Sequence, residues 1–180
     1  NAVGVQSDGK VYIAGNFAQY AGTGRVRIAR INADGTLDTD FVPTTGFNVE
    51  PSALVVQSDN KVVVGGNFST YNSTGRNYIA RVNADGSLDT SFDPGTGISG
   101  WNVSSVALDI NEKIYIGGGY TSYNSTSRNH IVRVNSDGSL DTAFNPGTNI
   151  IANFVRAIYP QPDGKVIIAG WLTSYSGTSR

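Results

Sequence analysis

One stretch of the sequence recurs about every 52 residues, and this repetition constrains the fold more than any other feature. A lysine, a tyrosine and an arginine return in step, at spacings of 51, 52 and 52 residues. The lysines are Lys10, Lys61, Lys113 and Lys165, the tyrosines are Tyr20, Tyr71, Tyr123 and Tyr175, and the arginines are Arg25, Arg76, Arg128 and Arg180. Self-similarity at a fixed period of this size is typical of solenoids, propellers and related arrays.

A single repeat divides into four predicted strands. In the second repeat these are Ser52–Gln57, Lys61–Phe68, Asn77–Asn83 and the short Ser87–Phe92, each of strand length and most of them rich in β-branched residues. Asp-Asn and Asp-Gly pairs separate the strands and supply the positive φ that tight hairpin turns require. A Gly- and Ser-rich linker then runs to about Asn102.

Four antiparallel strands in about fifty residues match one blade of a β-propeller. The linker must return from an outer to an inner strand, about 15 Å, which eight or nine residues can span. A β-solenoid is the alternative, but its coils usually take about 20–30 residues. We therefore predict an all-β fold, a single array of β-propeller-type repeats of about 52 residues. The predicted blades are approximately 1–47, 48–99 and 100–151, with a partial blade at 152–180.

Three blades and a half are fewer than the four or more that close a propeller ring. The expectation is that the chain is a window from a longer protein and part of a larger propeller. Two copies joined in a seven-bladed ring are a weaker alternative, because both would contribute the same two strands at the seam.

Composition excludes several classes of function. The 180 residues carry a formal net charge of −1, and the 13 basic residues are dispersed, so no basic stripe favours nucleic acid. The apolar runs are far shorter than the roughly 18–20 residues of a membrane helix. There is no cysteine and only one histidine, which removes thiolate and histidine-rich metal sites. We predict no cofactor, no metal site and no enzymatic activity.

Charged residues recur on two of the predicted strands. The arginines are Arg30, Arg81 and Arg133 on the third strand, and the aspartates are Asp38, Asp89 and Asp141 on the fourth. Pairing of opposite charges across neighbouring strands explains both series. A ring of arginines that binds an anion is the alternative, and it requires these side chains to converge on one surface.

The Asp-Gly segment of the second repeat resembles part of a calcium-binding loop, with Asp85 and Asp89 as its carboxylates. In that pattern Arg81 and Phe92 would occupy the first and last ligand positions, which neither side chain can fill. A turn is therefore the preferred interpretation, and an irregular calcium site in these loops is the alternative.

The tyrosine series lies in polar loops and supplies the first candidate binding residues. An aromatic ring beside hydroxyl and amide groups is suited to recognise a sugar or a peptide. The candidates are Tyr20, Tyr71, Tyr123 and Tyr175, together with Asn72 and Asn124. The alternative is structural: each tyrosine packs between blades and bonds locally.

Three residues break the repeat and are candidates for an individual role. They are Trp101, His130 and Trp171, and Trp171 stands where other repeats have Asn16, Asn67 and Gly119. We include Trp101 and Trp171 among the predicted ligand-binding residues. Trp171 covering the end of the array is the alternative.

Two family resemblances follow from these motifs. An apolar run ending in Gly-Gly, then an aromatic residue and an Asp-Gly turn, resembles a kelch repeat, although phenylalanine stands at Phe41, Phe92 and Phe144 where kelch has tryptophan. The segments Gln6–Phe17 and Arg27–Phe41 more closely resemble the bacterial delta-60 repeat family. That resemblance implies a propeller in large secreted, surface-attached or phage-encoded proteins, without established catalytic residues.

These observations together predict a non-catalytic scaffold or binding module of a larger secreted, cell-surface or phage-appendage protein. Its expected partners are other domains or chains of an assembly, or a cell-surface glycan, and its expected location is extracellular, on the bacterial surface or in a virion. A lectin-like propeller that uses the Tyr/Asn loops is the alternative. An enzyme would need an active site outside this stretch.

Overall fold

The computed structural model describes residues 1–146, 150–175 and 178–179, except for the side chains of 150–152, 175 and 178–179. Within this part of the chain all regular structure is β-strand, as predicted. Each repeat opens with a pair of antiparallel strands. The first strands are β1 (Ala2–Val5), β6 (Pro51–Val56), β11 (Ile98–Leu108) and β15 (Ile150–Pro160). The second strands are β2 (Val11–Ala14), β7 (Val62–Gly66), β12 (Ile114–Tyr123) and β16 (Val166–Tyr175).

A third strand follows in the first three repeats, after a small polar hairpin. The third strands are β5 (Ile28–Ile31), β10 (Ile79–Val82) and β14 (Ile131–Val134). The hairpins contain β3 (Gln19–Tyr20) with β4 (Thr23–Gly24) and β8 (Thr70–Tyr71) with β9 (Thr74–Gly75). In the last two repeats the hairpin continues the second strand, so that β13 (Thr126–Ser127) pairs with β12 and β17 (Thr178–Ser179) pairs with β16.

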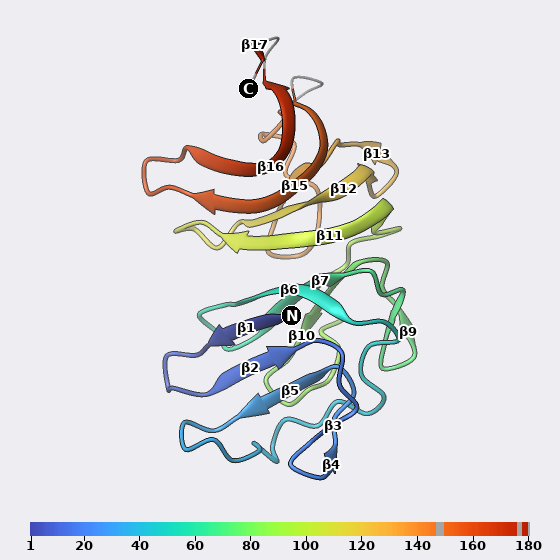
Figure 1. The fold of residues 1–180 in the computed structure, drawn as a ribbon, viewed down its shortest axis with the longest axis vertical. Helices are drawn as coiled ribbons and strands as arrows, with labels where there is room; N and C mark the ends of the chain where they lie inside the picture. The colour runs from blue at the N-terminus through green and yellow to red at the C-terminus, as the bar shows by residue number, and fades with distance from the viewer. Residues whose placement is uncertain (147–149, 176–177, 180) are drawn as a thin grey trace.

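The second strand lies at the centre of each sheet. In the second repeat β7 pairs with β6 on one edge, with Val56 opposite Val62, and with β10 on the other, with Val82 opposite Val62. The same antiparallel order is found in the first repeat and in the third. The four sheets follow one another along the long axis of the molecule (Figure 1). Separate antiparallel sheets of this kind are blades and not solenoid coils.

The predicted fourth strand is much shorter than expected. In each of the first three repeats it is reduced to one bridge, which joins Val82 and Leu88 in the second repeat. One further bond there runs from the Asp89 amide to the Arg81 carbonyl. The chain then bends away because the Asp89 carboxylate accepts the amide of Ser91, 3.0 Å away. A carboxylate that bonds its own backbone two residues on forms a turn, and this turn ends the strand.

The linker between repeats also differs from the prediction. The Gly/Ser-rich stretch is not a free connection, because Ile98 and Ser99 already pair with Tyr123 and Ser122 of β12. The predicted boundaries at 99/100 and 151/152 consequently fall inside β11 and β15. Register shifts at Ser99/Gly100 and beyond let the irregular stretch join the sheet.

Neighbouring sheets pack face to face, and glycine permits their close approach. A Cβ on Gly65 of β7 would lie 2.3 Å from Val103 of the next repeat, and one on Gly117 would lie 2.7 Å from Ile158. The valine and isoleucine side chains of one blade thus fill the space that the preceding strand leaves open. The interdigitating side chains form three apolar core clusters, one at each junction between neighbouring repeats. In the described residues no helix long and apolar enough to span a membrane is found.

Candidate functional site

The repeated arginines and aspartates form ion pairs within each of the first three repeats, buried in the first two and partly buried in the third. The Nε–Oδ2 distances are 2.6 Å for Arg30–Asp38, 2.7 Å for Arg81–Asp89 and 2.8 Å for Arg133–Asp141. A third group, which the sequence reasoning missed, is the repeated lysine at the start of the second strand. The Nζ–Oδ2 distances are 2.9 Å for Lys10–Asp38, 3.0 Å for Lys61–Asp89 and 3.3 Å for Lys113–Asp141. The sequence contains evidence for this third group, because the lysines recur at the same spacing as the arginines and the aspartates.

These aspartates are ionised, and each pairs with both an arginine and a lysine. Burial alone would raise the pKa of Asp89, but hydrogen bonds from Ser91, Lys61 and Arg81 outweigh it and hold that pKa well below its usual range. The Arg81 guanidinium also donates to the Ser136 carbonyl of the next repeat. Each arginine therefore pairs with the aspartate of its own blade, as the structural interpretation predicted, and Arg81 in addition bonds the next blade.

The tyrosine hydroxyls are occupied as well. Each donates to the carbonyl of a glycine fifteen residues further on, in the Asp-Gly turn of the same repeat: Tyr20 to Gly35, Tyr71 to Gly86 and Tyr123 to Gly138. Tyr71 and Tyr123 are completely buried, and burial raises the pKa of both phenols. Tyr20 is half-buried, and the side chain of Tyr175 lies outside the described residues.

The rings of Tyr71 and Tyr123 therefore offer no surface on which a ligand could stack. This geometry agrees with the structural alternative for the tyrosine series. Ligand binding by the half-buried Tyr20 stays a prediction.

Asn72 and Asn124 begin the tight turns of the polar hairpins. Asn72 and Ser73 both have positive φ, 46° and 62°, which is the type I′ geometry that asparagine tolerates. The Asn72 side chain accepts the amides of Thr45 and Gly46 from the preceding repeat, at 3.1 and 3.0 Å. Asn124 accepts the Thr96 amide at 3.2 Å in the same way. Both side chains thus hydrogen-bond the linker that comes from the preceding repeat. Ligand binding by Asn72 and Asn124 stays a prediction.

The Asp-Gly turns have the local bonding of turns. The Asp85 carboxylate accepts both the amide and the hydroxyl of Ser87, at 2.8 and 2.7 Å, and these bonds lower its pKa. Asp34 and Asp137 bond Thr36 and Ser139 in the same way. Across the described ranges no three His, Cys, Asp or Glu side chains lie together as a metal site would require.

The residues that break the repeat have three different environments. Trp101 is 81% exposed on the irregular part of β11, and Trp171 is 60% exposed on β16. The Arg156 guanidinium lies 4.6 Å from the centre of the Trp171 ring, a cation–π contact. His130 is half-buried, and its Nδ1 lies 3.3 Å from the Gly118 carbonyl oxygen.

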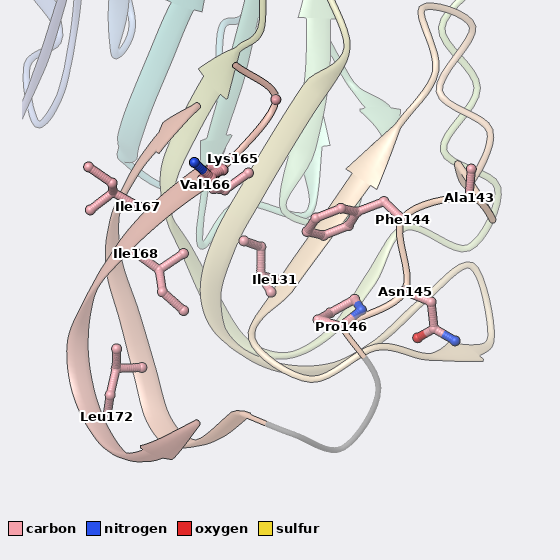
Figure 2. A pocket seen from close by; sticks show the side chains of 11 residues that line it. Ile131, Ala143, Phe144, Asn145, Pro146, Lys165, Val166, Ile167, Ile168 and Leu172 are labelled. Atoms are coloured by element: carbon pink, nitrogen blue, oxygen red, sulfur yellow. The ribbon is translucent and has the colours of Figure 1, made fainter. Parts of the chain in front are cut away.

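Two hollows are lined in part by sequence neighbours of these residues. A polar hollow of about 540 Å³, with Gly100 in its lining, lies at the junction of the second and third repeats. Its polar lining comes from Asn77, Thr96, Ser99, Gly100, Ser122 and Ser125. A larger, apolar hollow of about 840 Å³ lies between the third and fourth repeats. Figure 2 shows Ile131 and Phe144 on one side of it and Ile168 on the other.

The apolar hollow was missed by the sequence reasoning. Its lining residues, such as Ile131, Phe144 and Ile168, stand at recurring apolar positions, which predict core and give no sign of a hollow.

Repeated antiparallel sheets packed face to face define the class of protein: this is a β-propeller-type repeat protein. The model of a domain of unknown function (DUF5122) β-propeller family matches residues 6–41, 57–92, 111–144 and 161–180. The chain belongs to this family, and the prediction of propeller-type repeats is confirmed.

Two solved structures resemble the chain. A protein of unknown function from Bacteroides caccae is 15% identical with a TM-score of 0.39, over 98% of this chain and 71% of that one. The extracellular domain of a putative hybrid two-component system from B. thetaiotaomicron is 13% identical with a TM-score of 0.43, over 97% of this chain. The chain spans only 26% of that second structure. No curated protein matches the chain.

Proposed function

We propose that the chain is a non-catalytic interaction module, a stretch of β-propeller that presents binding surfaces within a larger protein. Its partners would be other domains or chains of an assembly, or a cell surface. We further propose that the repeats are of the delta-60 type and that the protein is secreted, attached to the bacterial surface or part of a phage appendage. The resemblance of Gln6–Phe17 and Arg27–Phe41 to that family supports this location.

The proposal rests on the hydrogen bonds and ion pairs that the recurring polar residues already make. In the repeats that are fully described, the recurring arginine, aspartate and tyrosine groups are bonded within or between blades. Large apolar side chains are exposed at Trp101, Ile110 and Trp171, three positions at which the repeats differ from one another. Contiguous exposed apolar patches mark interaction surfaces, and tryptophan is enriched among the residues that carry binding energy.

The test compares the parent chain with a variant that carries Trp101→Ser and Trp171→Ser. Each is immobilised and exposed to bacterial surface extract, and the retained proteins are quantified by mass spectrometry. We expect specific partners to be enriched at least tenfold on the parent. Generic ester, phosphate and glycoside substrates should turn over at the rate of buffer alone. Equal retention on both chains, or turnover that a single Asp→Asn change removes, would refute the proposal.

A second candidate function, carbohydrate binding, is favoured by one specific observation. The exposed Trp101 directly follows Gly100, which lines the polar hollow, and the hydroxyl and amide groups of that lining would suit a sugar whose apolar face stacks on the indole ring. In this proposal the lectin-like surface is centred on Trp101 and not on the buried rings of Tyr71 and Tyr123.

A glycan array probed with the parent and with Trp101→Ala tests this candidate. Binding that the parent shows and Trp101→Ala loses, while Trp171→Ala keeps it, would support a sugar site at the polar hollow. Binding that all three chains share would place any sugar site elsewhere.

A further inference from the structure

The junction between the first two repeats is closed by one polar side chain of the linker, that of Asn48. Its side-chain oxygen accepts the amides of Ser69 and Thr70, both at 3.0 Å, and its amino group donates to the Ser69 hydroxyl at 2.9 Å. A carboxamide has one group that accepts hydrogen bonds and one that donates them, and both are used here. The first junction thus shows which chemistry fits this place between two blades.

At the junction between the second and third repeats a serine replaces this asparagine. Ser99 stands where the first junction has Asn48. It lies opposite Ser122 of β12, the counterpart of Thr70. Both serines line the polar hollow of about 540 Å³. Because a serine side chain is too short to supply the carboxamide, the hollow lies where the first junction is closed.

The polar hollow is also lined by hydroxyl groups that are free to bond a ligand. Tyr78, Ser99 and Ser122 each contribute one, and none of the three has a hydrogen-bond partner in the part of the chain that the structure describes. At the first junction the counterpart of Tyr78 is Arg27, which has a similar positive φ, 63° against 69°. The Arg27 guanidinium donates to the Phe47 carbonyl at 3.0 Å. The second junction therefore has a neutral hydroxyl where the first has a cation that is already bonded.

The lining of the polar hollow favours a neutral ligand. Among the described residues that line it, no side chain is ionised, since the others are Asn77, Thr96, Ile98, Gly100 and Ser125. An ionic ligand would lose water there without gaining a partner of opposite charge. Trp101 directly follows Gly100 and is 81% exposed, and an indole ring suits the apolar face of a sugar.

We propose that the polar hollow binds an N-acetylated amino sugar, with its acetamido group at the place that the Asn48 carboxamide occupies in the first junction. The acetamido carbonyl accepts and its N–H donates, as the two halves of the Asn48 side chain do. The ring hydroxyls of the sugar bond the hydroxyls of Tyr78, Ser99 and Ser122. This inference names the ligand class of the carbohydrate candidate, and so rests on it.

A pair of matched sugars tests the acetamido group. The whole chain is titrated by calorimetry with chitotriose, a trimer of N-acetylglucosamine, and with cellotriose, the glucose trimer of the same linkage. We expect chitotriose to bind about tenfold more tightly, because cellotriose leaves unpaired the groups that bond the acetamido group. Equal affinity of the two sugars would overturn the proposal.

Ser99→Asn returns the carboxamide of the first junction to the second. It should weaken chitotriose binding about tenfold, because the new side chain takes the place of the acetamido group. Ser136→Asn is the matched control, since it makes the same exchange at an exposed turn outside the hollow, and it should bind as the parent does. Unchanged binding by Ser99→Asn would overturn the proposal.

Two measurements keep a loss of binding separate from a loss of folding. Asn48 shows that the fold accepts asparagine at this position, so Ser99→Asn should melt at the temperature of the parent by circular dichroism. Tyr78→Phe keeps the ring and removes its hydroxyl, and it should weaken chitotriose severalfold. A Tyr78→Phe chain that binds chitotriose as the parent does would contradict the proposed contact.

The remaining outcomes distinguish this inference from the candidate on which it rests. A glycan array on which the parent binds only glycans without an acetamido group would overturn the inference and leave carbohydrate binding standing. An array without any bound glycan would refute both. Displacement of chitotriose by a Gly-Asn-Gly peptide at equal concentration would show that the hollow takes a peptide carboxamide, which also overturns the inference.

Discussion

Arg81 and Asp89 are joined by an Nε–Oδ2 contact of 2.7 Å that is almost closed to solvent. The same guanidinium reaches the Ser136 carbonyl of the following repeat, so one side chain connects a third strand, its tail and the next blade. Removing one partner of a buried pair leaves the other charge uncompensated and is strongly destabilising. The pair is therefore a sensitive place to test how the repeats hold together.

Asp89→Asn removes the charge that Arg81 and Lys61 face. Loss of one partner of a buried pair leaves the other uncompensated and costs about 3–5 kcal/mol. We expect the free energy of unfolding, measured by urea titration, to fall by about this amount. Asp163→Asn, which breaks only the exposed pair with Lys165, is the control. An Asp89→Asn chain as stable as the control would show that the pair does not support the fold.

Stability should fall with acid in a defined direction. Asp38, Asp89 and Asp141 have pKa values lowered by their hydrogen bonds and cationic neighbours. Because each pKa is lower in the folded chain than in the unfolded chain, the stabilisation is complete above the ordinary carboxyl pKa of about 4. It is lost as the pH falls through the lower folded values.

Urea titrations from pH 7 to pH 2.5 measure this dependence. The parent should lose stability below about pH 4, and Asp89→Asn should show a smaller loss because it has one such carboxylate fewer. Parallel curves for the two chains would contradict the role given to Asp89.

Gly65→Ala should weaken the contact between the second and third repeats. The new methyl group would lie 2.3 Å from Val103, and overpacking of this kind costs about 1–3 kcal/mol. Gly75→Ala is the matched control, because it places a methyl group in the same repeat where no atom lies within 4 Å. Thermal melts followed by circular dichroism should show a lower Tm for Gly65→Ala alone. Equal melting temperatures would mean that the blades can move apart at no cost.

Tyr71→Phe removes the hydroxyl that bonds the Gly86 carbonyl at 2.6 Å, entirely within the core. A buried bond of this type contributes about 1 kcal/mol, and urea titration should report a loss of that size. Tyr20→Phe removes the equivalent bond from a half-buried ring, where water can replace it, and should cost less. A larger loss for Tyr20→Phe would reverse this assignment.

The repeat period and the strand pairs could be predicted because short alternating segments such as Asn77–Asn83 and repeated Asp-Gly turns determine them locally. The fourth strand could not, since its early end depends on the Asp89 carboxylate bonding the Ser91 amide. The polar residues around Tyr71 predict a loop and do not reveal that its ring is buried. The burial results from packing against Phe47, a residue of the preceding linker. The pairing of Lys61 with Asp89 could not be predicted either, because it depends on how β7 and the segment after β10 lie beside each other in three dimensions.

The irregular register of β11 has a consequence for how such chains can diversify. The two repeat periods of 51 and 52 residues differ by one residue inserted between Phe92 and Lys113. The shifts at Ser99/Gly100 and beyond absorb irregularity in that interval without disturbing the pairing of Val106 with Ile116. The segment around Trp101 can therefore differ in length by one residue while the strands on either side keep their pairing. A change of length at this place shifts the position of an exposed side chain and leaves the sheet intact.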